Sequence, residues 1–430
     1  MATLVTIDSD VGSQAQVRLT GGRQLVENGA TSYLFYVDTN SDLVYKKSPD
    51  SGATWGNKVV IHAATYEEVS VWFDQWTPAD AGTTVHIWGI EAGLDDVNYF
   101  SLNIATDTLG NSGTAIVVFA GASTSTVGIY QWLSGTKARG GNLYIAFDID
   151  GGTERGFYRS VDAGANWVSR TSPFEVGAND FMLLFPGNET DTQDVWNVFW
   201  DRSTDELSLK VNADAADTWA ETAIASSFTD ISPATSSTQF AGSINPSNNH
   251  LYLAAWNNQD VSTADLQTWD INGGGSITAR ANIVTNADDT ACVALAITPL
   301  GKVCAFYHGK ESGADTAMTS MSLCRKTSTD GMVTWSAESA LLETLFDSSG
   351  ILAVALVSEA EDPFIATALT TSVGGGAPDQ WVGSFGAPAS GGKGSGGKGK
   401  GGNTPGPGEP PKKPLRTSLS KSWKWDRGWR

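Results

Sequence analysis

Short apolar strands recur along the chain, and each ends in an aromatic or acidic residue that is followed by a polar loop. These strands begin near Ser32, Thr84, Asn142, Asp194, His250, Lys302 and Pro363. Their starts lie 52 to 61 residues apart. Alternating apolar and polar positions indicate half-buried β-strands, and a repeat of this length is typical of propeller blades. The pattern therefore predicts an all-β propeller.

Further apolar strands flank the repeated ones, for example residues 71–73 before one and 59–61 after another, which predicts four strands in each blade. The seventh unit has only three, since residues 380–385 supply its third strand and the composition then changes. We expect residues 3–7 to supply the fourth, because joining both termini in one blade removes an exposed sheet edge. We favour seven blades; the alternative is six, with residues 351–385 as an appendage.

Composition divides the chain into three parts. Residues 1–385 form the predicted propeller, and residues 386–414 are rich in Gly, Lys and Pro, as in a flexible linker. Residues 415–430 are basic and contain three Trp. Aromatic anchors beside cations favour a peptide that docks onto a partner protein; the alternative is a disordered terminus. The proposed docking residues are Arg416, Trp423, Trp425, Arg427 and Trp429.

The charge of the chain is uneven. The net charge is -20, and from residue 386 onward ten Lys and Arg stand against two acidic residues, which leaves about -28 on the body. Such a body repels nucleic acid and anionic membranes and attracts cations or basic partners. We find no apolar run of membrane-spanning length and no classical signal peptide at the start. We therefore expect the protein in a virus particle or outside a cell by a non-classical route, and otherwise in the cytoplasm.

A short turn with the pattern Ser-x-Asp-x-Gly-x-Thr/Asn-Trp occurs at residues 48–55 and 160–167, with looser copies at 212–219 and 328–335. In such a turn an Asp accepts hydrogen bonds from backbone amides, Gly takes a positive φ and Trp packs beneath. The turn resembles the Asp-box of sialidases and other Asp-box propellers. We expect structural roles for Ser48, Asp50, Gly52, Trp55, Ser160, Asp162, Gly164, Trp167, Asp330 and Trp335.

The resemblance implies a sialidase site, in which three arginines hold a carboxylate, a Tyr activated by a Glu attacks, and an Asp is the acid/base. The candidate matches are Arg18 for the first arginine, Asp38 or Asp42 for the acid/base, and Tyr307 with Glu311 for the nucleophile pair. The second and third arginines have no match, because Arg155 and Arg202 stand in different local patterns. An acidic site would also repel an anionic sugar.

The loops between the second and third strands of the units are rich in carboxylates, and we expect them on the face that holds a ligand. Candidate ligand-binding residues are Trp88, Asp95, Asp148, Asp150, Trp200, Asp201, Arg202 and Trp256. The Trp residues either stack on sugar rings or pack in the core. Asp148, Asp150 and Glu154 are candidate Ca²⁺ ligands, although no cofactor is required. The alternatives are carboxylates that hydrolyse a neutral glycan and a merely solvated face.

The three cysteines fall on neighbouring predicted strands, at Cys292, Cys304 and Cys324. We expect small buried apolar residues; the alternative is one disulfide and a free thiol. The four histidines are scattered and form no ligand pattern.

Together these features favour a non-enzymatic binding protein. The propeller would be displayed on a phage or virus particle by its C-terminal tail, and its acidic face would recognise a glycan or another surface ligand. Two alternatives stay open, a sialidase-like glycoside hydrolase and a scaffold that docks protein partners.

Overall fold

The structure is a computed structural model. It describes residues 4–11, 23–121, 132–149, 154–174, 180–201, 204–228, 240–260, 263–311, 323–342, 351–369 and 380–384. The chain divides into two compact units, Met1–Pro388 and Ala389–Arg430. The predicted linker and docking peptide lie outside the described residues.

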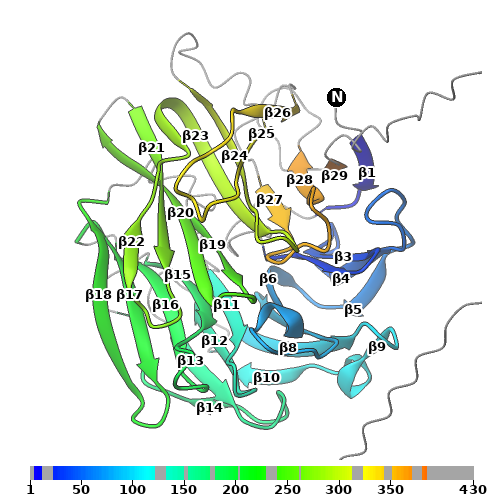
Figure 1. Cartoon of the computed structure of the whole chain (residues 1–430). Coiled ribbons are helices and arrows are strands. Elements are labelled where there is room, and N and C mark those ends of the chain that lie inside the picture. Colours follow the sequence, from blue (N-terminus) through cyan, green and yellow to red (C-terminus); the bar gives the residue numbers. More distant parts are fainter. Residues whose placement is uncertain are drawn as a thin grey trace, which may run out of the picture. The chain divides into compact units, whose positions relative to one another are not determined.

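The described residues form β-sheets whose strands are mostly consecutive in the chain (Figure 1). The first sheet holds β2 (Leu25–Asn28), β3 (Thr31–Val37), β4 (Leu43–Ser48) and β5 (Val59–His62). The second holds β6 (Tyr66–Phe73), β7 (Thr84–Glu91), β8 (Asp96–Asn103), β9 (Thr108–Leu109) and β10 (Ile116–Phe119). The third holds β11 (Trp132–Lys137), β12 (Leu143–Asp148), β13 (Arg155–Ser160) and β14 (Val168–Ser169). The fourth holds β15 (Phe181–Pro186), β16 (Val195–Asp201), β17 (Glu206–Ala213) and β18 (Thr218–Ser226).

The fifth sheet is larger, with β19 (Phe240–Asn245), β20 (His250–Asp260), β21 (Thr263–Ile271), β22 (Ile277–Ala279), β23 (Val284–Ile297), β24 (Val303–Glu311), β25 (Leu323–Ser328) and β26 (Ser339–Leu342). The sixth holds β27 (Ile351–Val354), β28 (Ile365–Leu369), β29 (Gln380–Ser384) and β1 (Leu4–Asp8). Two short 3₁₀ segments, η2 (Asp74–Trp76) and η3 (Gly110–Gly113), are the helical elements of the described residues.

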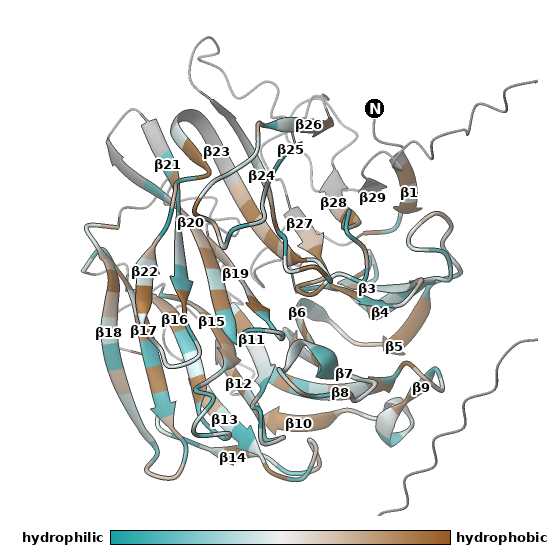
Figure 2. Cartoon of the chain, viewed as in Figure 1, coloured by the Kyte–Doolittle hydropathy of each residue, from teal (hydrophilic) through white to brown (hydrophobic). Residues whose placement is uncertain are grey.

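The strand pattern in the sequence correctly predicted an all-β propeller. Strands β3, β7, β16 and β20 begin within one residue of their expected starts. Figure 2 shows apolar and polar bands along the strands of the fourth sheet; β15 and β16 are buried along their whole length, whereas β18 at the edge is largely exposed. Neighbouring strands within each sheet run antiparallel, as the short hairpin loops between them require.

The expected closure of the last blade by the N-terminal strand is confirmed. Strand β1 pairs antiparallel with β29, with Leu4 opposite Ser384 and Thr6 opposite Val382. The two strands lie almost a whole chain length apart in sequence, so this pairing covers an edge that would otherwise stay open.

The favoured number of seven blades is wrong, because the structure has six sheets and hence six blades. The repeats that begin near His250 and Lys302 do not form separate sheets. Strand β23 is 14 residues long and its first half pairs with β21, with Ala264 opposite Ala287 and Leu266 opposite Val284. This pairing merges two repeats into one eight-stranded sheet. The appendage expected for a six-bladed chain is also wrong, since residues 351–384 form a sheet with β1.

Large aromatic side chains pack between the blades. Trp88 of β7 is fully buried, and a Cβ added to Gly135 of β11 would come within 2.3 Å of its ring. Only glycine lets the next blade approach the indole this closely. The expectation of small buried cysteines is confirmed, because Cys292, Cys304 and Cys324 are buried and free.

One buried cation joins three blades. The Arg23 guanidinium donates to Ser134 Oγ at 3.0 Å and lies 4.3 Å from the Phe185 ring centroid. It is completely buried, and burial lowers its pKa to about 9. Its NH1 group is hydrogen-bonded and its charge faces aromatic rings, but Nε and NH2 have no hydrogen-bond partner in the described part of the chain, so the lost water is replaced only in part. Among the described residues, no helix is long and apolar enough to cross a membrane.

Candidate functional site

The carboxylate of Asp38 is used inside its own hairpin. It is 1% exposed, and its Oδ1 accepts hydrogen bonds from the backbone N–H groups of Asn40 at 2.9 Å and Asp42 at 3.0 Å. Its Oδ2 is ion-paired with Lys58. Asp42 is half-buried on the same loop. Asp38 therefore stabilises the β3–β4 loop and presents no free acid/base oxygen.

Other expected ligand-binding carboxylates are also bound within their loops. Asp148 Oδ2 accepts from Arg155 Nε at 3.0 Å, and Asp201 Oδ1 accepts from the Thr204 backbone N–H at 3.2 Å. Asp95 is fully buried in a left-handed backbone conformation with a φ of 58°. Asp148 and Asp201 therefore stabilise their own loops.

The proposed Ca²⁺ ligands are not brought together within the described residues. Asp148 is paired with Arg155, Glu154 is half-buried, and Asp150 lies outside the described part of the chain. No group of three or more His, Cys, Asp or Glu that could hold a metal occurs in the described ranges. Calcium binding stays a prediction.

Trp88, Trp200 and Trp256 are all fully buried. Trp200 packs against Phe228 with ring centroids 5.2 Å apart, and Trp256 Nε1 donates to the Cys292 carbonyl at 3.3 Å. Of the two roles left open for these rings, stacking on a sugar or packing in the core, burial supports packing in the core, since none has an exposed face. They are core residues.

The candidate sialidase residues do not assemble. Tyr307 is buried, and its hydroxyl donates to Glu338 Oε2 rather than to an open site. Arg18 and Arg202 lie outside the described residues, and the side chain of Glu311 is also outside them. A catalytic set of the sialidase kind is therefore not formed by the described side chains.

Three of the four turn copies form the same hydrogen bonds. In the first, Thr54 N–H donates to Asp50 Oδ1 at 2.7 Å, Gly52 N–H donates to Ser48 Oγ at 2.8 Å, and Trp55 Nε1 donates to the Gly52 carbonyl at 3.0 Å. The corresponding Asp and Ser bonds recur at residues 160–166 and 328–334. In the last copy Met332, with a φ of 67°, replaces the glycine, and Trp335 bonds instead to Ala281. These hydrogen bonds lower the pKa of Asp330 to about 2, with the Thr334 side chain as the largest cause.

The first two of these turns lie against an aromatic residue of the preceding blade. A Cβ added to Gly52 would meet the Phe364 ring at 2.6 Å, and one added to Gly164 would meet the Tyr99 ring at 2.1 Å. Gly331 lies near the Tyr252 hydroxyl. The first two turns therefore connect neighbouring blades, a role that the local motif does not reveal, whereas the third contacts a residue of its own eight-stranded sheet.

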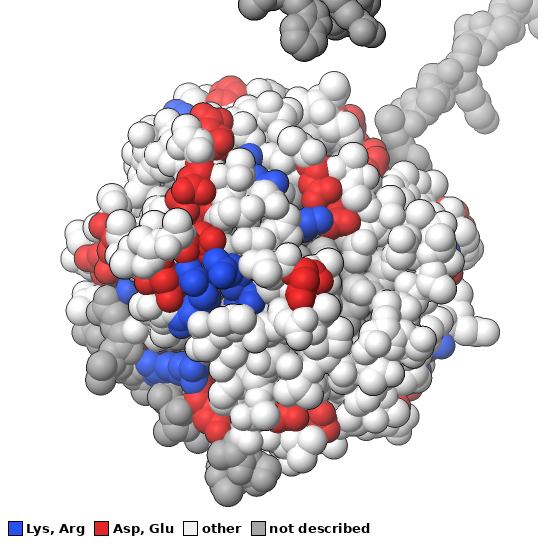
Figure 3. Space-filling model, turned by 90° about the horizontal axis from the view of Figure 1, so that it is seen from below, with Lys and Arg blue, Asp and Glu red and all other residues white. Residues whose placement is uncertain are grey.

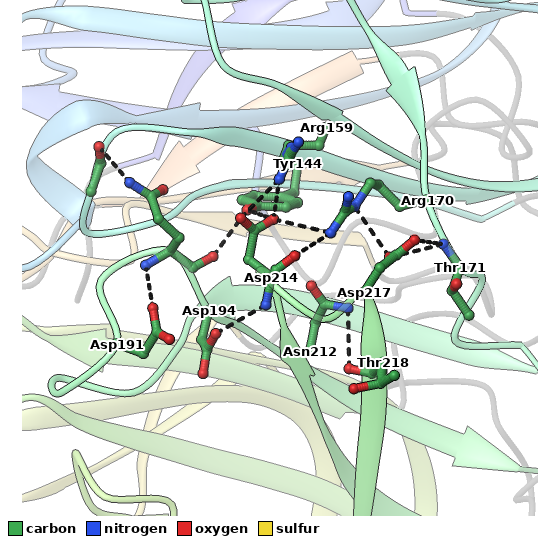
Figure 4. A network of polar contacts seen from close by, with 12 residues as sticks. Tyr144, Arg159, Arg170, Thr171, Asp191, Asp194, Asn212, Asp214, Asp217 and Thr218 are labelled. Carbon is green, nitrogen blue, oxygen red and sulfur yellow. Dashed lines mark hydrogen bonds and ion pairs between the residues drawn. The ribbon is translucent and has the colours of Figure 1, made fainter.

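The looser copy at residues 212–219 connects its blades with charge instead (Figure 4). Asp214 accepts two hydrogen bonds from Arg159 NH1, at 2.7 and 2.8 Å, and one from the Tyr144 hydroxyl at 2.7 Å. Arg170 reaches both Asp214 and Asp217. The carboxylate is therefore directed at the third sheet and away from its own turn.

Charges of opposite sign are mixed on the surface. On the face in Figure 3, Lys and Arg side chains lie directly beside Asp and Glu side chains, and much of the face carries neither. Ion pairs such as Arg280–Asp270 at 2.6 Å are typical of the described residues. On this face the acidic charge is therefore partly offset by neighbouring cations.

A pocket of about 420 Å³ lies between the second and third blades. Its walls come from β8, from the η3 segment and the start of β10, and from the 160–167 turn. The lining residues are Tyr99, Phe100, Ser101, Gly110, Asn111, Thr114, Ile116, Ala163 and Ala165. None of them is charged, and they combine aromatic surface with hydroxyl, amide and backbone groups. This volume and mixture suit a small neutral polar ligand.

A chain of buried polar side chains begins at this pocket. The Tyr99 hydroxyl lies 2.8 Å from His86 Nδ1, and His86 Nε2 lies 3.0 Å from Asp74 Oδ1. Lys137 Nζ contacts Asp74 at 2.5 Å and Asp80 at 2.7 Å. Tyr99, His86 and Asp74 are 2, 4 and 3% exposed. Their scattered positions in the sequence gave no indication of this chain.

The protonation states follow from burial and from these contacts. Burial lowers the pKa of His86, although Asp74 opposes that effect, and burial raises the pKa of Tyr99. Burial alone would raise the pKa of Asp74, but hydrogen bonds from His86 and Lys137 hold it below its ordinary value. At neutral pH the chain therefore contains an ionised Asp74, a neutral imidazole and a neutral phenol.

Comparisons by sequence identify no relative. No family model matches the chain, and no curated protein matches it.

Comparisons by structure find propellers. A polysaccharide lyase of family PL25, an ulvan lyase bound to a GlcA-Rha3S unit, has a TM-score of 0.55 at 8% identity and covers 88% of this chain and 95% of its own. The SapL1 lectin in complex with α-methyl fucoside has a TM-score of 0.46 at 9% identity, over 76% of this chain and 99% of its own. A GH93 α-L-arabinofuranosidase of Fusarium graminearum has a TM-score of 0.39 at 13% identity, over 56% and 74%. At these identities the first likeness shows the propeller fold alone, and the sialidase resemblance stays a prediction.

Proposed function

We propose that this protein is a non-catalytic carbohydrate-binding propeller and that the pocket between the second and third blades holds a neutral sugar. The observation that carries the proposal is the pocket itself, with its uncharged hydrogen-bonding walls beside Tyr99 and Phe100. Sugars need both kinds of surface, because their C–H faces are apolar and their hydroxyls donate and accept hydrogen bonds. Propellers that bind or cleave glycans are among the structural neighbours, which is consistent with this proposal.

The absence of charge among the lining residues favours a neutral sugar over an acidic one. Asp74, Asp80 and Lys137 behind the pocket together carry about one negative charge, which disfavours an anionic ligand further. A single sugar ring has about 12 non-hydrogen atoms, and at about -0.3 kcal/mol per atom its Kd would be about millimolar. Binding of a single site is therefore measured best by ligand-observed NMR.

Filling the pocket should abolish binding without unfolding the protein. Ala165 is exposed on the pocket rim, so Ala165→Trp places an indole in the pocket and should weaken binding at least tenfold. The measurement is saturation-transfer NMR of the full chain against a panel of neutral methyl glycosides. The matched control is Ala53→Trp, since Ala53 is exposed at the same position of the first turn, outside this pocket. Equal binding by both variants would contradict the assignment of the pocket.

We also infer that residues 415–430 attach the propeller to a larger assembly, for which a phage or virus particle is the setting we favour. Three Trp in a basic peptide at the end of a linker rich in Gly, Lys and Pro are the support for this proposal. Changing Trp423, Trp425 and Trp429 together to Ser should reduce co-sedimentation of the full chain with source particles at least tenfold. The control replaces Lys393, Lys398 and Lys400 of the linker by Ser. Retention of the Trp variant on particles would refute the attachment role.

A further inference from the structure

The hydrogen-bond chain behind the pocket has a fixed direction. An ionised carboxylate only accepts hydrogen bonds, so His86 Nε2 carries the ring proton and donates it to Asp74. A neutral imidazole has one N–H, and His86 Nδ1 is therefore an acceptor. The tautomer is assigned from this network.

The Tyr99 hydroxyl completes the chain. Its proton is donated to His86 Nδ1 at 2.8 Å, and the only other acceptor that the described contacts offer it, the Ala163 carbonyl, is farther away at 3.4 Å. The phenol has a single proton, so its oxygen is left with acceptor capacity only. Ser101 lies two residues along β8, on the same face of the strand, and its hydroxyl donates to the oxygen of the same phenol. The Ser101 proton is used in this bond, so at this end of the pocket the Ser101 oxygen can only accept.

This direction determines what the inner wall of the pocket recognises. We infer that the Tyr99–Ser101 end of the pocket accepts a hydrogen bond from one hydroxyl of a neutral sugar and so discriminates against ligand groups that cannot donate. The inference rests on the proposed sugar binding and adds the direction of one hydrogen bond, in which the protein accepts and the sugar donates. Ether, carbonyl and carboxylate groups present only lone pairs to this end of the pocket and are rejected there.

The geometry makes the contact hard to rearrange. Gly164 of the neighbouring turn lies directly over the Tyr99 ring, and Trp88 and Trp167 pack around it with ring centroids 5.6 and 5.4 Å away. The ring cannot rotate its hydroxyl away from His86 without moving the adjacent blade. A preorganised acceptor of this kind loses little entropy when a ligand binds.

The test uses the full chain and the tightest-binding methyl glycoside of the panel, with each hydroxyl replaced in turn by fluorine, which does not donate. In the wild type, we expect one replacement to weaken binding at least about fivefold. In Tyr99→Phe, the parent glycoside and that fluoro analogue should bind within about twofold of each other. Tyr252→Phe is the matched control, because Tyr252 lies under the equivalent turn at Gly331 and its variant should keep the wild-type discrimination.

The outcomes separate the two proposals. If no glycoside of the panel binds the wild type, the proposed function fails. If a glycoside binds in a way that Ala165→Trp blocks, but no fluoro analogue is discriminated, or Tyr99→Phe keeps the discrimination, the inferred polarity is overturned and the sugar site stands. Ser101→Ala gives an independent variant should Tyr99→Phe prove too unstable, and it too should reduce the discrimination.

Discussion

Replacing Asp74 by Ala should destabilise the propeller by about 3–5 kcal/mol, the range for removing one partner of a buried ion pair. Asp74 is 3% exposed and accepts hydrogen bonds from His86, from Lys137 and from the Thr84 backbone N–H at 2.8 Å. Without the carboxylate, the buried His86 and the half-buried Lys137 and Thr84 N–H lose their common acceptor. The free energy of unfolding from urea titration, followed by Trp fluorescence, measures the effect.

Asp80→Ala is the control for that variant. Asp80 pairs with the same Lys137, but its side chain is 22% exposed, so water can take its place and the loss should stay below about 1 kcal/mol. A loss for Asp74→Ala that does not exceed the loss for Asp80→Ala would show that the buried chain contributes nothing specific to stability.

Gly52→Ala should destabilise the protein by about 2–5 kcal/mol, because two costs coincide there. The φ of Gly52 is 87°, where a Cβ is strained, and that Cβ would overlap the Phe364 ring. The ring cannot retreat, since Gly383 lies against it too, where an added Cβ would approach to 2.1 Å. The variant therefore tests the contact that joins the last blade to the first.

Gly275→Ala separates the two costs, because Gly275 has a φ of 83° and no atom within 4 Å of an added Cβ. Gly275→Ala should reduce the free energy of unfolding only by the cost of the left-handed backbone, about 1–2 kcal/mol. In a Phe364→Leu background, Gly52→Ala should cost less than in the wild type, by about 1–3 kcal/mol in a double-mutant cycle. Equal losses for Gly52→Ala and Gly275→Ala, or an additive cycle, would show that the turn does not connect the blades.

The fold was largely predictable because its strands are specified locally. The apolar run SYLFYV placed β3, and the missing fourth strand of the last unit placed β1 beside β29. The number of blades could not be predicted from the sequence, because the pairing of β21 with β23 depends on how far β23 extends. Sequence periodicity counts repeats, whereas hydrogen bonding between repeats determines how many sheets they form.

The candidate site was much less predictable. The sequence directs attention to carboxylates and Trp, yet Asp38 and Asp148 stabilise their own loops and Trp88 packs against the next blade. The pocket is built by β8, by a loop after it and by a turn some sixty residues further on, and no motif joins these segments. His86 was recognisable only as a buried strand residue, because its partners Asp74 and Tyr99 lie on neighbouring segments of the sheet.

The central claim is that a neutral sugar binds between the second and third blades. The most direct test is a crystal structure of the full chain soaked with the tightest-binding glycoside of the panel. The account predicts sugar density against Tyr99, Asn111 and Ala165, with one sugar hydroxyl within hydrogen-bonding distance of the Tyr99 or Ser101 oxygen. Sugar density at another place, such as the loops that hold Asp148 and Asp201, with this pocket empty, would contradict it.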